Sequence, residues 1–369
     1  MNSKIIYEIY EFVKKKAEQN NLNRYVKSHT LEKMVLLLFY YQTQKIKYGR
    51  SFVKNLALLF GQTEKSISQS EFSKKLNHKL PISIWKNLFQ FVLKKVNSKP
   101  SYIKKSILRK IQIIDSSTLD STLSMKWAKH RKAKNGLKLH LMIDSDLAPK
   151  GFRLKNGKSS DKKSIKWAVE SGFIYVFDRG YNDFKLFSWI SDKNSYFVTR
   201  AYKNISYEIK SNRKIGHAQR KKGIDADQIV SLCLDRKTGE KIDFRLITFN
   251  FIDSNGKEQN FSFLTNIVDL KSDEIADIYR ERWNIEVVFR WIKMYLNISH
   301  WYSRSKNGVM IQLYCALIIY MLVFFLKNKF KTYSNVIRDY CHYLGAVLFR
   351  YIQLYKINMR FQEFSQIQV

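Results

Sequence analysis

The sequence predicts an α/β protein with a mixed β-sheet, and three observations support this. A helical N-terminal stretch ends near Lys99-Pro100, where the periodicity of apolar residues changes from that of helices to that of strands. Three strand candidates come first, and helix and strand then alternate up to about residue 200. A β-rich interval follows at 201–270, before helical periodicity returns. Consecutive strands followed by alternating helix and strand are typical of a mixed sheet covered by helices.

Residues 1–100 are expected to form a helical N-terminal domain. Apolar periodicity predicts its helices at 31–41, 51–60 and 82–96. Ser51 is placed to cap the second, and Ser68 is followed three residues later by Glu71, which is the spacing of a capping box. Short basic helices in succession suit a DNA-binding unit of helix-turn-helix type, although many unrelated helical domains show the same pattern.

The remaining elements are expected in the following order. Strands are predicted at 111–114, 136–144 and 151–154, then a helix at 161–171, the strand FIYVF before Asp178, a helix at 183–191 and the strand YFVTR. The interval 201–270 holds the strand-like segments ISYEIK, IVSLCLD, DFRLITFNFID and NFSFLTNIV, separated by turns. The predicted divisions are therefore 1–100, 101–200, 201–270 as an insertion, 271–330 as the second part of the core, and a helical 331–369.

The charge of the chain indicates a polyanionic partner. Lys and Arg number 66 against 31 Asp and Glu, and the excess is spread along the sequence. Such a surplus attracts nucleic acid first and anionic membrane surfaces second. Ribosomal or chromatin-like packing proteins are equally basic, but they rarely need isolated acids inside apolar strands.

Cysteine usage and hydropathy favour a protein of the reducing cytoplasm. Cys233, Cys315 and Cys341 form no CxxC spacing, so neither a disulfide framework nor a zinc site is indicated. The N-terminus lacks the pattern of a secretory signal. The 18 residues of 309–326 are almost entirely apolar, which is about the minimum length for a membrane span. A helix that is apolar all round also suits the centre of a large domain, so no membrane partner is expected and a membrane-associated protein is the alternative.

Two aspartates and a glutamate are candidate metal ligands. Asp115 and Asp178 each follow a short apolar strand, and sites in open α/β sheets gather at strand ends. Asp is also common there as a turn former, so one alone would be unremarkable. Together with Glu286, the three carboxylates could hold two Mg²⁺ ions about 4 Å apart for displacement at a phosphate.

The segment YRERWNIEVVFRWIK places four polar side chains on one helical stripe. At about 100° per residue, Tyr279, Arg282, Glu286 and Lys293 lie within about 60° of each other. An adjacent face carries the apolar residues Ile285, Val288, Ile292 and Leu296. A solvated helix face with Glu–Lys pairs is the simpler interpretation of such a stripe taken alone.

The ordered motifs resemble those of a known enzyme family. IQIIDSST at Asp115, GLKLH, VFDRGY at Asp178, FLTN and the spacing Y-x2-R-x3-E-x6-K resemble the bacterial insertion-sequence DDE transposases, particularly those with the YREK signature. The similarity covers roughly residues 100–330. It implies a ribonuclease-H-like catalytic core and the work of a DNA transposase, which binds terminal inverted repeats, cleaves the transposon ends and transfers the freed 3′-hydroxyl to target DNA.

The resemblance also implies roles for residues. Asp115, Asp178 and Glu286 would be the catalytic triad that holds two Mg²⁺ ions, for which Mn²⁺ can substitute. Tyr279, Arg282 and Lys293 would grip the DNA strand end, and the chain would act as a homodimer on double-stranded DNA. The chemistry of arginine agrees with the role implied for Arg282, because a guanidinium can bind a phosphate through two hydrogen bonds.

Several assignments stay open at this stage. Relatives that excise through a hairpin use a Trp from the β-rich insertion, and this sequence has no Trp between Trp189 and Trp283, so the hairpin route is open. Arg179, Lys138 and His140 are further candidates for DNA contact, with ordinary surface or sheet roles as the alternative. Acids near turns or helix starts are expected to be structural, namely Asp144, Asp161 and Asp183. An inactive or domesticated DNA-binding protein on the same scaffold is the second functional hypothesis.

Overall fold

The fold is known from a computed structural model, which describes residues 2–24, 26, 30–44, 73–96, 110–120, 125, 127, 136–157, 165–235, 237–252, 256, 258–296, 298, 301, 303–330 and 337–356. The chain divides into two compact units. One unit comprises Met1–Pro100, Leu119–Leu137 and Phe289–Val369, and the other comprises Ser101–Thr118 and Lys138–Val288. The helix predicted at 51–60, the caps at Ser51, Ser68 and Glu71, and Asp161 lie outside the described residues.

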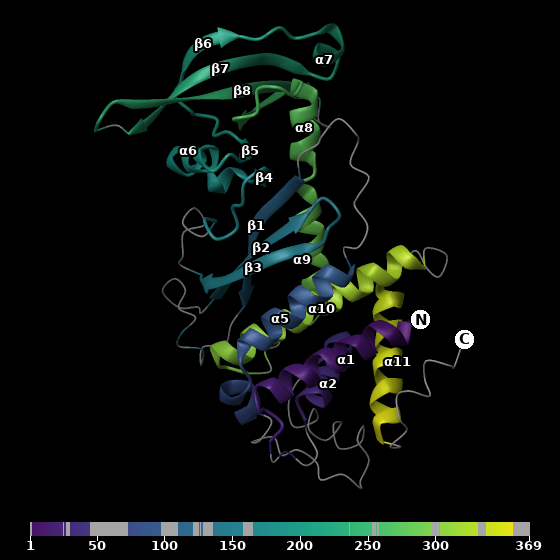
Figure 1. The fold of residues 1–369 in the computed structure, drawn as a ribbon. Helices are drawn as coiled ribbons and strands as arrows, with labels where there is room; N and C mark the ends of the chain where they lie inside the picture. Colours follow the sequence, from purple (N-terminus) through teal and green to yellow (C-terminus); the bar gives the residue numbers. More distant parts are fainter. Residues whose placement is uncertain are drawn as a thin grey trace. The chain divides into compact units, whose positions relative to one another are not determined.

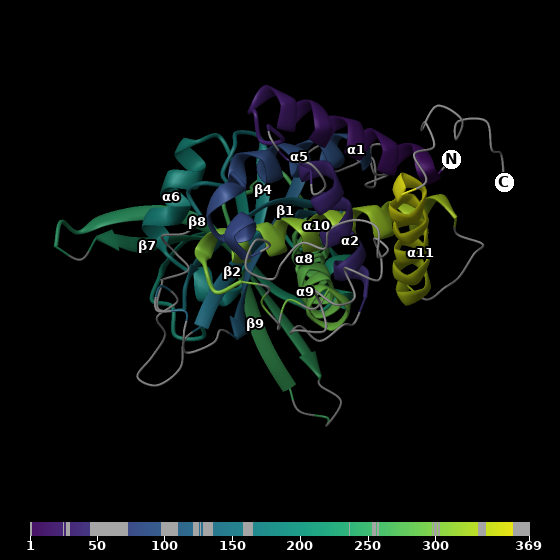
Figure 2. The same ribbon diagram turned by 90° about the horizontal axis from the view of Figure 1, so that it is seen from below.

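The first unit is helical. Its elements are α1 (Asn2–Gln19), α2 (Leu31–Thr43), the π-helix η1 (Lys75–Lys79), α5 (Ile82–Val96), α10 (Lys306–Lys329) and α11 (Ile337–Lys356). The helices predicted at 31–41 and 82–96 are thereby confirmed. Helix α10 packs against α5, α2 and α11, and it runs beside α5 in both views of the molecule (Figures 1 and 2).

Helix α10 contains the long apolar stretch of the sequence. Among the described residues it is the one helix that is long and apolar enough to cross a membrane, and 83% of its most apolar window is buried inside the protein. Gln312, the polar residue within it, is fully buried. The Asn307 side chain donates hydrogen bonds to the carbonyl groups of Leu76 and Leu80 at 2.8 and 2.9 Å, which fixes the start of α10 against η1. This burial is that of a core helix.

The second unit is built on one nine-stranded sheet. Its strands are β1 (Lys110–Asp120), β2 (Gly136–Asp144), β3 (Pro149–Asn156), β4 (Phe173–Phe177), β5 (Tyr196–Arg200), β6 (Glu208–Asn212), β7 (Ile224–Asp235), β8 (Glu240–Ile252) and β9 (Glu258–Thr265). The order across the sheet is β3-β2-β1-β4-β5-β9-β8-β7-β6. Strands β1, β4 and β5 are parallel, whereas β5, β9, β8, β7 and β6 pair antiparallel.

This arrangement confirms a mixed-sheet α/β protein with a ribonuclease-H-like core, in which β3-β2-β1-β4-β5 is the core sheet. The β-rich interval does not form a separate sheet. Strand β9 pairs with β5, with Arg200 opposite Phe263, so the interval lengthens the core sheet and its strands β6, β7 and β8 extend side by side (Figure 1).

An aromatic cluster holds the helix α6 (Phe184–Asp192) against the sheet. The Phe187 ring stacks on Phe197 of β5 with centroids 4.2 Å apart, and Phe197 meets Phe244 of β8 edge-on at 5.0 Å. The Asp183 carboxylate accepts a hydrogen bond from the Leu186 amide and caps α6, as predicted for this acid. Large aromatic side chains in such contacts bury much area, so the core strands and the added strands share one core.

Two predicted elements differ from the structure. The helix expected at 161–171 is wrong over its described residues 165–171, which form turns. The Tyr175 hydroxyl accepts a hydrogen bond from the Glu170 amide and lies 3.1 Å from the Ala168 carbonyl oxygen, so a buried side chain holds this backbone in its turns. The strand expected to end before Asp115 continues to Asp120.

The helix expected to carry Tyr279 through Lys293 is divided in two. Helix α8 (Ser272–Arg280) ends, and α9 (Trp283–Tyr295) begins after a short turn. The Arg282 amide donates to the Tyr279 carbonyl at 3.0 Å and the Ile285 amide to the Arg282 carbonyl at 3.3 Å. These are i to i−3 hydrogen bonds, which wind the backbone at about three residues per turn and bring side chains three apart into line. Tyr279 and Arg282 are therefore more closely aligned than on a regular α-helix.

Candidate active site

The register between β1 and β4 brings the two aspartates together. The last paired residues of these parallel strands are Ile114 and Phe177, and Asp115 and Asp178 are the residues that come next. Adjacent strands lie about 4.8 Å apart, so both carboxylates belong to the same edge of the parallel pair. Asp115 lies within a long strand but directly after the end of the β1–β4 ladder, which explains why both aspartates follow apolar runs.

The turn after β4 fixes the Asp178 carboxylate. Its Oδ1 accepts a hydrogen bond from the Gly180 amide, and the Thr199 hydroxyl of β5 lies 3.2 Å from the Asp178 carbonyl oxygen. A Cβ at position 180 would lie 2.9 Å from Oδ1 of Asp178. The glycine of the VFDRGY motif therefore provides the space in which this carboxylate sits.

The junction of α8 and α9 supplies the third carboxylate. Arg282 donates a hydrogen bond to Glu286 at 2.5 Å, and its guanidinium also lies 3.9 Å from Asp115. The same guanidinium lies 5.9 Å from the ring of Tyr279, and that ring also contacts Phe263 of β9 with centroids 4.5 Å apart. Arg282 thus connects Glu286 of the helix with Asp115 of the sheet.

Asp115 has the electrostatics of a crowded acidic site. Burial raises its pKa to about 6, and the carboxylates of Asp178 and Glu286 add to this increase. The Ser116 amide and Arg282 oppose it, because a hydrogen bond and a nearby cation stabilise the carboxylate. A divalent cation among these acids would relieve the repulsion.

The carboxylate oxygens of Asp115, Asp178 and Glu286 are ligands that fit a hard divalent cation. Carboxylate oxygens are the ligands that Mg²⁺ prefers. In the described part of the chain, no three His, Cys, Asp or Glu side chains are already grouped as a metal site. The guanidinium of Arg282 contacts both Asp115 and Glu286, so a metal ion held by these two carboxylates would require Arg282 to release Glu286.

Replacement of Asp115 by Asn is expected to stabilise the metal-free protein at neutral pH. A raised pKa in the folded state means that the Asp115 contribution to stability is present below about pH 4 and is lost as the pH rises through about 6. The advantage of Asp115→Asn should therefore grow to on the order of 2 kcal/mol at pH 7.

Denaturant unfolding in a chelator between pH 4 and 8 measures this difference. Asp192→Asn, at the exposed end of α6, is the control. An advantage of Asp115→Asn that shrinks with increasing pH would contradict the expected electrostatics.

The apolar face predicted for the α9 segment is confirmed. Ile285, Val288, Ile292 and Leu296 are each at most 1% exposed. Lys293 is exposed on α9, in the part of the helix that belongs to the first unit, whereas Tyr279, Arg282 and Glu286 belong to the second.

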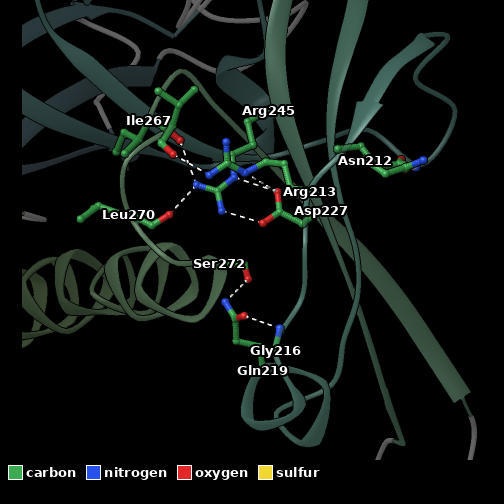
Figure 3. Close-up of polar contacts among 11 residues, drawn as sticks. Asn212, Arg213, Gly216, Gln219, Asp227, Arg245, Ile267, Leu270 and Ser272 are labelled. Carbon is green, nitrogen blue, oxygen red and sulfur yellow. Dashed lines mark hydrogen bonds and ion pairs between the residues drawn. The ribbon is translucent and has the colours of Figure 1, made fainter.

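A buried ion pair holds the segment that leads into α8 (Figure 3). Arg245 of β8 donates two hydrogen bonds to Asp227 of β7 at 2.8 and 2.7 Å, and these residues are 1% and 4% exposed. The same guanidinium donates to the carbonyl groups of Ile267 and Leu270 at 3.1 and 2.7 Å. Because Leu270 comes two residues before α8, Arg245 ties the added strands to the helix that carries Tyr279.

The other DNA-contact candidates have different environments. Arg179 is exposed directly after Asp178. Lys138 is half-buried, and His140 is only 1% exposed. The His140 side chain lies inside the protein, because β2 lies between β3 and β1 and its side chains are buried on both faces, and contact of His140 with DNA stays a prediction. Asp144, expected to be structural, accepts hydrogen bonds from the amides of Asp146 and Ala148.

Sequence reasoning missed the residues that support Tyr279. Arg200 lies 5.1 Å from the Phe261 ring, and Phe263 packs directly on Tyr279. Two features of the sequence contain these residues: the polar end of the strand YFVTR includes Arg200, and the motif FLTN includes Phe263. The Asn266 side chain of FLTN accepts from the Phe197 amide at 2.9 Å and donates to the Ser195 carbonyl at 2.9 Å, and so joins β5 to the end of β9.

Comparison with known proteins identifies the family of the chain. The family model described as "Transposase DDE domain" matches residues 107–322. The chain is 28% identical to a putative transposase for insertion sequence element IS4SA of Synechocystis sp., over 81% of this chain and 82% of that protein. It is 25% identical to a probable transposase for insertion sequence element IS5377 of Geobacillus stearothermophilus, over 79% and 80%. It is also 27% identical to the putative transposase y4zB of Sinorhizobium fredii, over 67% and 68%. Since the family match spans more than half of the chain, this protein belongs to the insertion-sequence transposases with a DDE domain, which cut and transfer DNA strands and generally use divalent metal ions.

Proposed function

We propose that this transposase cleaves the DNA at the ends of its own insertion sequence and joins the freed 3′-hydroxyl to target DNA, with Asp115, Asp178 and Glu286 as ligands of two Mg²⁺ or Mn²⁺ ions. One observation carries the proposal. The register of β1 and β4 places the two aspartates side by side, and Arg282 connects Asp115 to Glu286. When bound, such ions activate the attacking oxygen and stabilise the leaving oxygen.

The cationic neighbours suit the DNA strand end. In this proposal Tyr279, Arg282 and Lys293 hold the terminal phosphate, which is the arrangement of the YREK-signature subfamily. Arg282 exchanges its hydrogen bond with Glu286 for a phosphate when Glu286 turns to the metal. The exchange replaces one anion by another at the guanidinium, so the cation keeps a partner throughout. Arg179 and Lys138 then contact the DNA backbone nearby.

The rest of the proposed function concerns assembly. The helical region 1–100 binds the terminal inverted repeats, and a homodimer acts on paired ends in the cytoplasm, associated with the nucleoid. The net charge of +35 favours such binding to DNA over a compact monomer without a polyanion.

Cleavage of the natural flanking DNA tests the proposal. A plasmid that carries the reading frame with its flanks, incubated with purified protein, should be cut at short inverted repeats in Mg²⁺ or Mn²⁺ and remain intact in a chelator. Binding to those repeats without any nicking in Mg²⁺ or Mn²⁺ would instead favour the inactive DNA-binding protein.

Gly180→Ala is expected to lower cleavage roughly ten- to a hundredfold while the protein stays folded. The added Cβ would lie 2.9 Å from Oδ1 of Asp178, so the carboxylate has to turn away. Misplacement of a catalytic group by about 1 Å costs rate on this scale.

Cleavage rates together with thermal unfolding measure this effect. Gly239→Ala is the control, because its Cβ would meet nothing within 4 Å and its φ of +73° imposes backbone strain far from the carboxylates. Unchanged cleavage by Gly180→Ala would show that the position of the Asp178 carboxylate does not limit the reaction.

A further inference from the structure

The connection between strand β9 and helix α8 belongs to neither a strand nor a helix. Strand β9 ends at Thr265 and α8 begins at Ser272, and the residues between them have irregular backbone. The buried Arg245 guanidinium of β8 donates to two carbonyl groups of this connection, those of Ile267 and Leu270 (Figure 3). A side chain of the added strands therefore fixes the course of the backbone that leads into α8.

Two further side chains of the added segment act at the same place. Arg213, which follows β6, donates to the Val268 carbonyl at 2.7 Å. Gln219, on the short helix α7 (His217–Lys221), donates to the Ser272 hydroxyl at 2.7 Å (Figure 3). We call Arg213, Gln219 and Arg245 together the α8 anchor, because all three contact the start of α8 or the connection before it.

The α8 anchor adds direction to the apolar packing of α8. Ile275 and Ile278 of this helix are 0% and 1% exposed, and α8 lies against β5 and β7. Apolar burial is non-directional, so it holds the helix on the sheet without fixing where along the sheet the helix lies. Hydrogen bonds to backbone carbonyl groups have preferred distances and angles. The anchor therefore sets the placement of α8.

The placement of α8 determines where Tyr279 and Arg282 lie. Tyr279 is in the last turn of α8, and the Arg282 amide donates to its carbonyl group at 3.0 Å. The Arg282 side chain in turn contacts Glu286 and Asp115. A displacement at the start of this short helix is thus carried to the side chains beside the proposed catalytic carboxylates.

Stability alone does not account for an ion pair at this position. Asp227 and Arg245 are 4% and 1% exposed, and replacement of such a buried pair by apolar residues is often neutral or stabilising. Asp227 holds the guanidinium through both carboxylate oxygens, which leaves its remaining donors directed at the connection. The apolar alternative would fill the space but could not donate to these carbonyl groups.

We infer that Arg245 is a positioning residue for DNA cleavage, which acts through α8 to hold Tyr279 and Arg282 where the DNA strand end binds. The inference rests on the proposed function, in which these two side chains hold the terminal phosphate. It gives the added strands β7 and β8 a part in the reaction through a buried ion pair, without contact between that pair and DNA.

The double variant Asp227→Leu/Arg245→Met separates positioning from stability. It leaves no buried charge unpaired, so its thermal unfolding should occur close to that of the unaltered protein. It cannot donate to the Ile267 and Leu270 carbonyl groups, so cleavage of already bound transposon ends in Mg²⁺ or Mn²⁺ should be roughly ten- to a hundredfold slower. Binding of the ends in a mobility-shift assay should stay within a fewfold, because many phosphate contacts contribute to it.

Asp243→Leu/Lys210→Met is the matched control. It makes the same types of substitution in an exposed ion pair on β6 and β8 of the same sheet, and it should leave both unfolding and cleavage unchanged. Gln219→Ala tests the anchor without altering a buried charge. It removes the contact with the Ser272 hydroxyl and should slow cleavage a fewfold at an unchanged unfolding temperature.

The outcomes separate this inference from the proposed function. If Asp227→Leu/Arg245→Met recovers both thermal stability and full cleavage, the ion pair is only structural, and the transposase function stands. If that double variant does not fold, full-speed cleavage by Gln219→Ala would contradict the α8 anchor. If the unaltered protein binds the ends and cleaves nothing in either metal, the proposed function itself fails.

Discussion

Alanine at Asp115, Asp178 or Glu286 is expected to reduce metal-dependent cleavage of the transposon ends by at least about a thousandfold. Two bound metal ions stabilise the transition state of phosphate displacement by several kcal/mol, and each 1.4 kcal/mol is about tenfold in rate. In the proposed site each carboxylate is a metal ligand, so loss of any one leaves the ions with an incomplete set of oxygen ligands. Binding of the ends should remain within a fewfold of the unaltered protein, because binding depends mainly on cationic contacts to phosphates.

Cleavage and mobility-shift assays on the same DNA separate the two effects. Asp277→Ala is the control. This substitution removes the same negative charge, but Asp277 lies on α8 in an exposed ion pair with Arg280. Mn²⁺ should also increase the thermal stability of the unaltered protein more than that of any triad variant. Cleavage retained by any of the three alanine variants would refute the assignment of that residue.

The sheet and its two aspartates could be predicted because strand patterns are local. Strands β2, β4 and β5 lie where their apolar runs predicted them. The position of Asp115 within a longer strand could not be predicted, since the end of a parallel ladder depends on the partner strand. Here β4 ends at Phe177, and the β1–β4 ladder therefore ends at Ile114.

The stripe of Tyr279, Arg282 and Glu286 was predicted for a different reason than the structure gives. A regular helix would place the three side chains on one face by its periodicity. The structure aligns them through a tight turn between α8 and α9, and Phe263 of β9 positions Tyr279. The pairing of distant segments sets both features, so a local periodicity could not reveal them. The same holds for His140, whose burial depends on what covers β2.

The ion pair between Asp227 and Arg245 was also invisible in the sequence, because its partners meet only when β7 and β8 pair. In the folded protein it offers a test of how firmly the added strands hold α8. Asp227 accepts hydrogen bonds on both carboxylate oxygens, and Arg213 lies 3.6 Å from one of them. Removal of the carboxylate leaves a fully buried guanidinium without its counter-ion.

Asp227→Ala is therefore expected to destabilise the protein by roughly 3–5 kcal/mol, measured by denaturant unfolding, since a buried charge that loses its partner costs about this much. The double variant Asp227→Leu/Arg245→Met should recover most of the loss, because an apolar pair of similar size avoids the uncompensated charge. Asp243→Ala is the control in the same sheet, where the exposed pair with Lys210 should contribute about 0–1 kcal/mol. Hydrogen exchange should show faster opening of α8 in both Asp227 variants, because Arg245 either loses its anchor or no longer holds the carbonyl groups of Ile267 and Leu270. A cost of Asp227→Ala no larger than that of Asp243→Ala would show that the buried pair does not hold the added strands to α8.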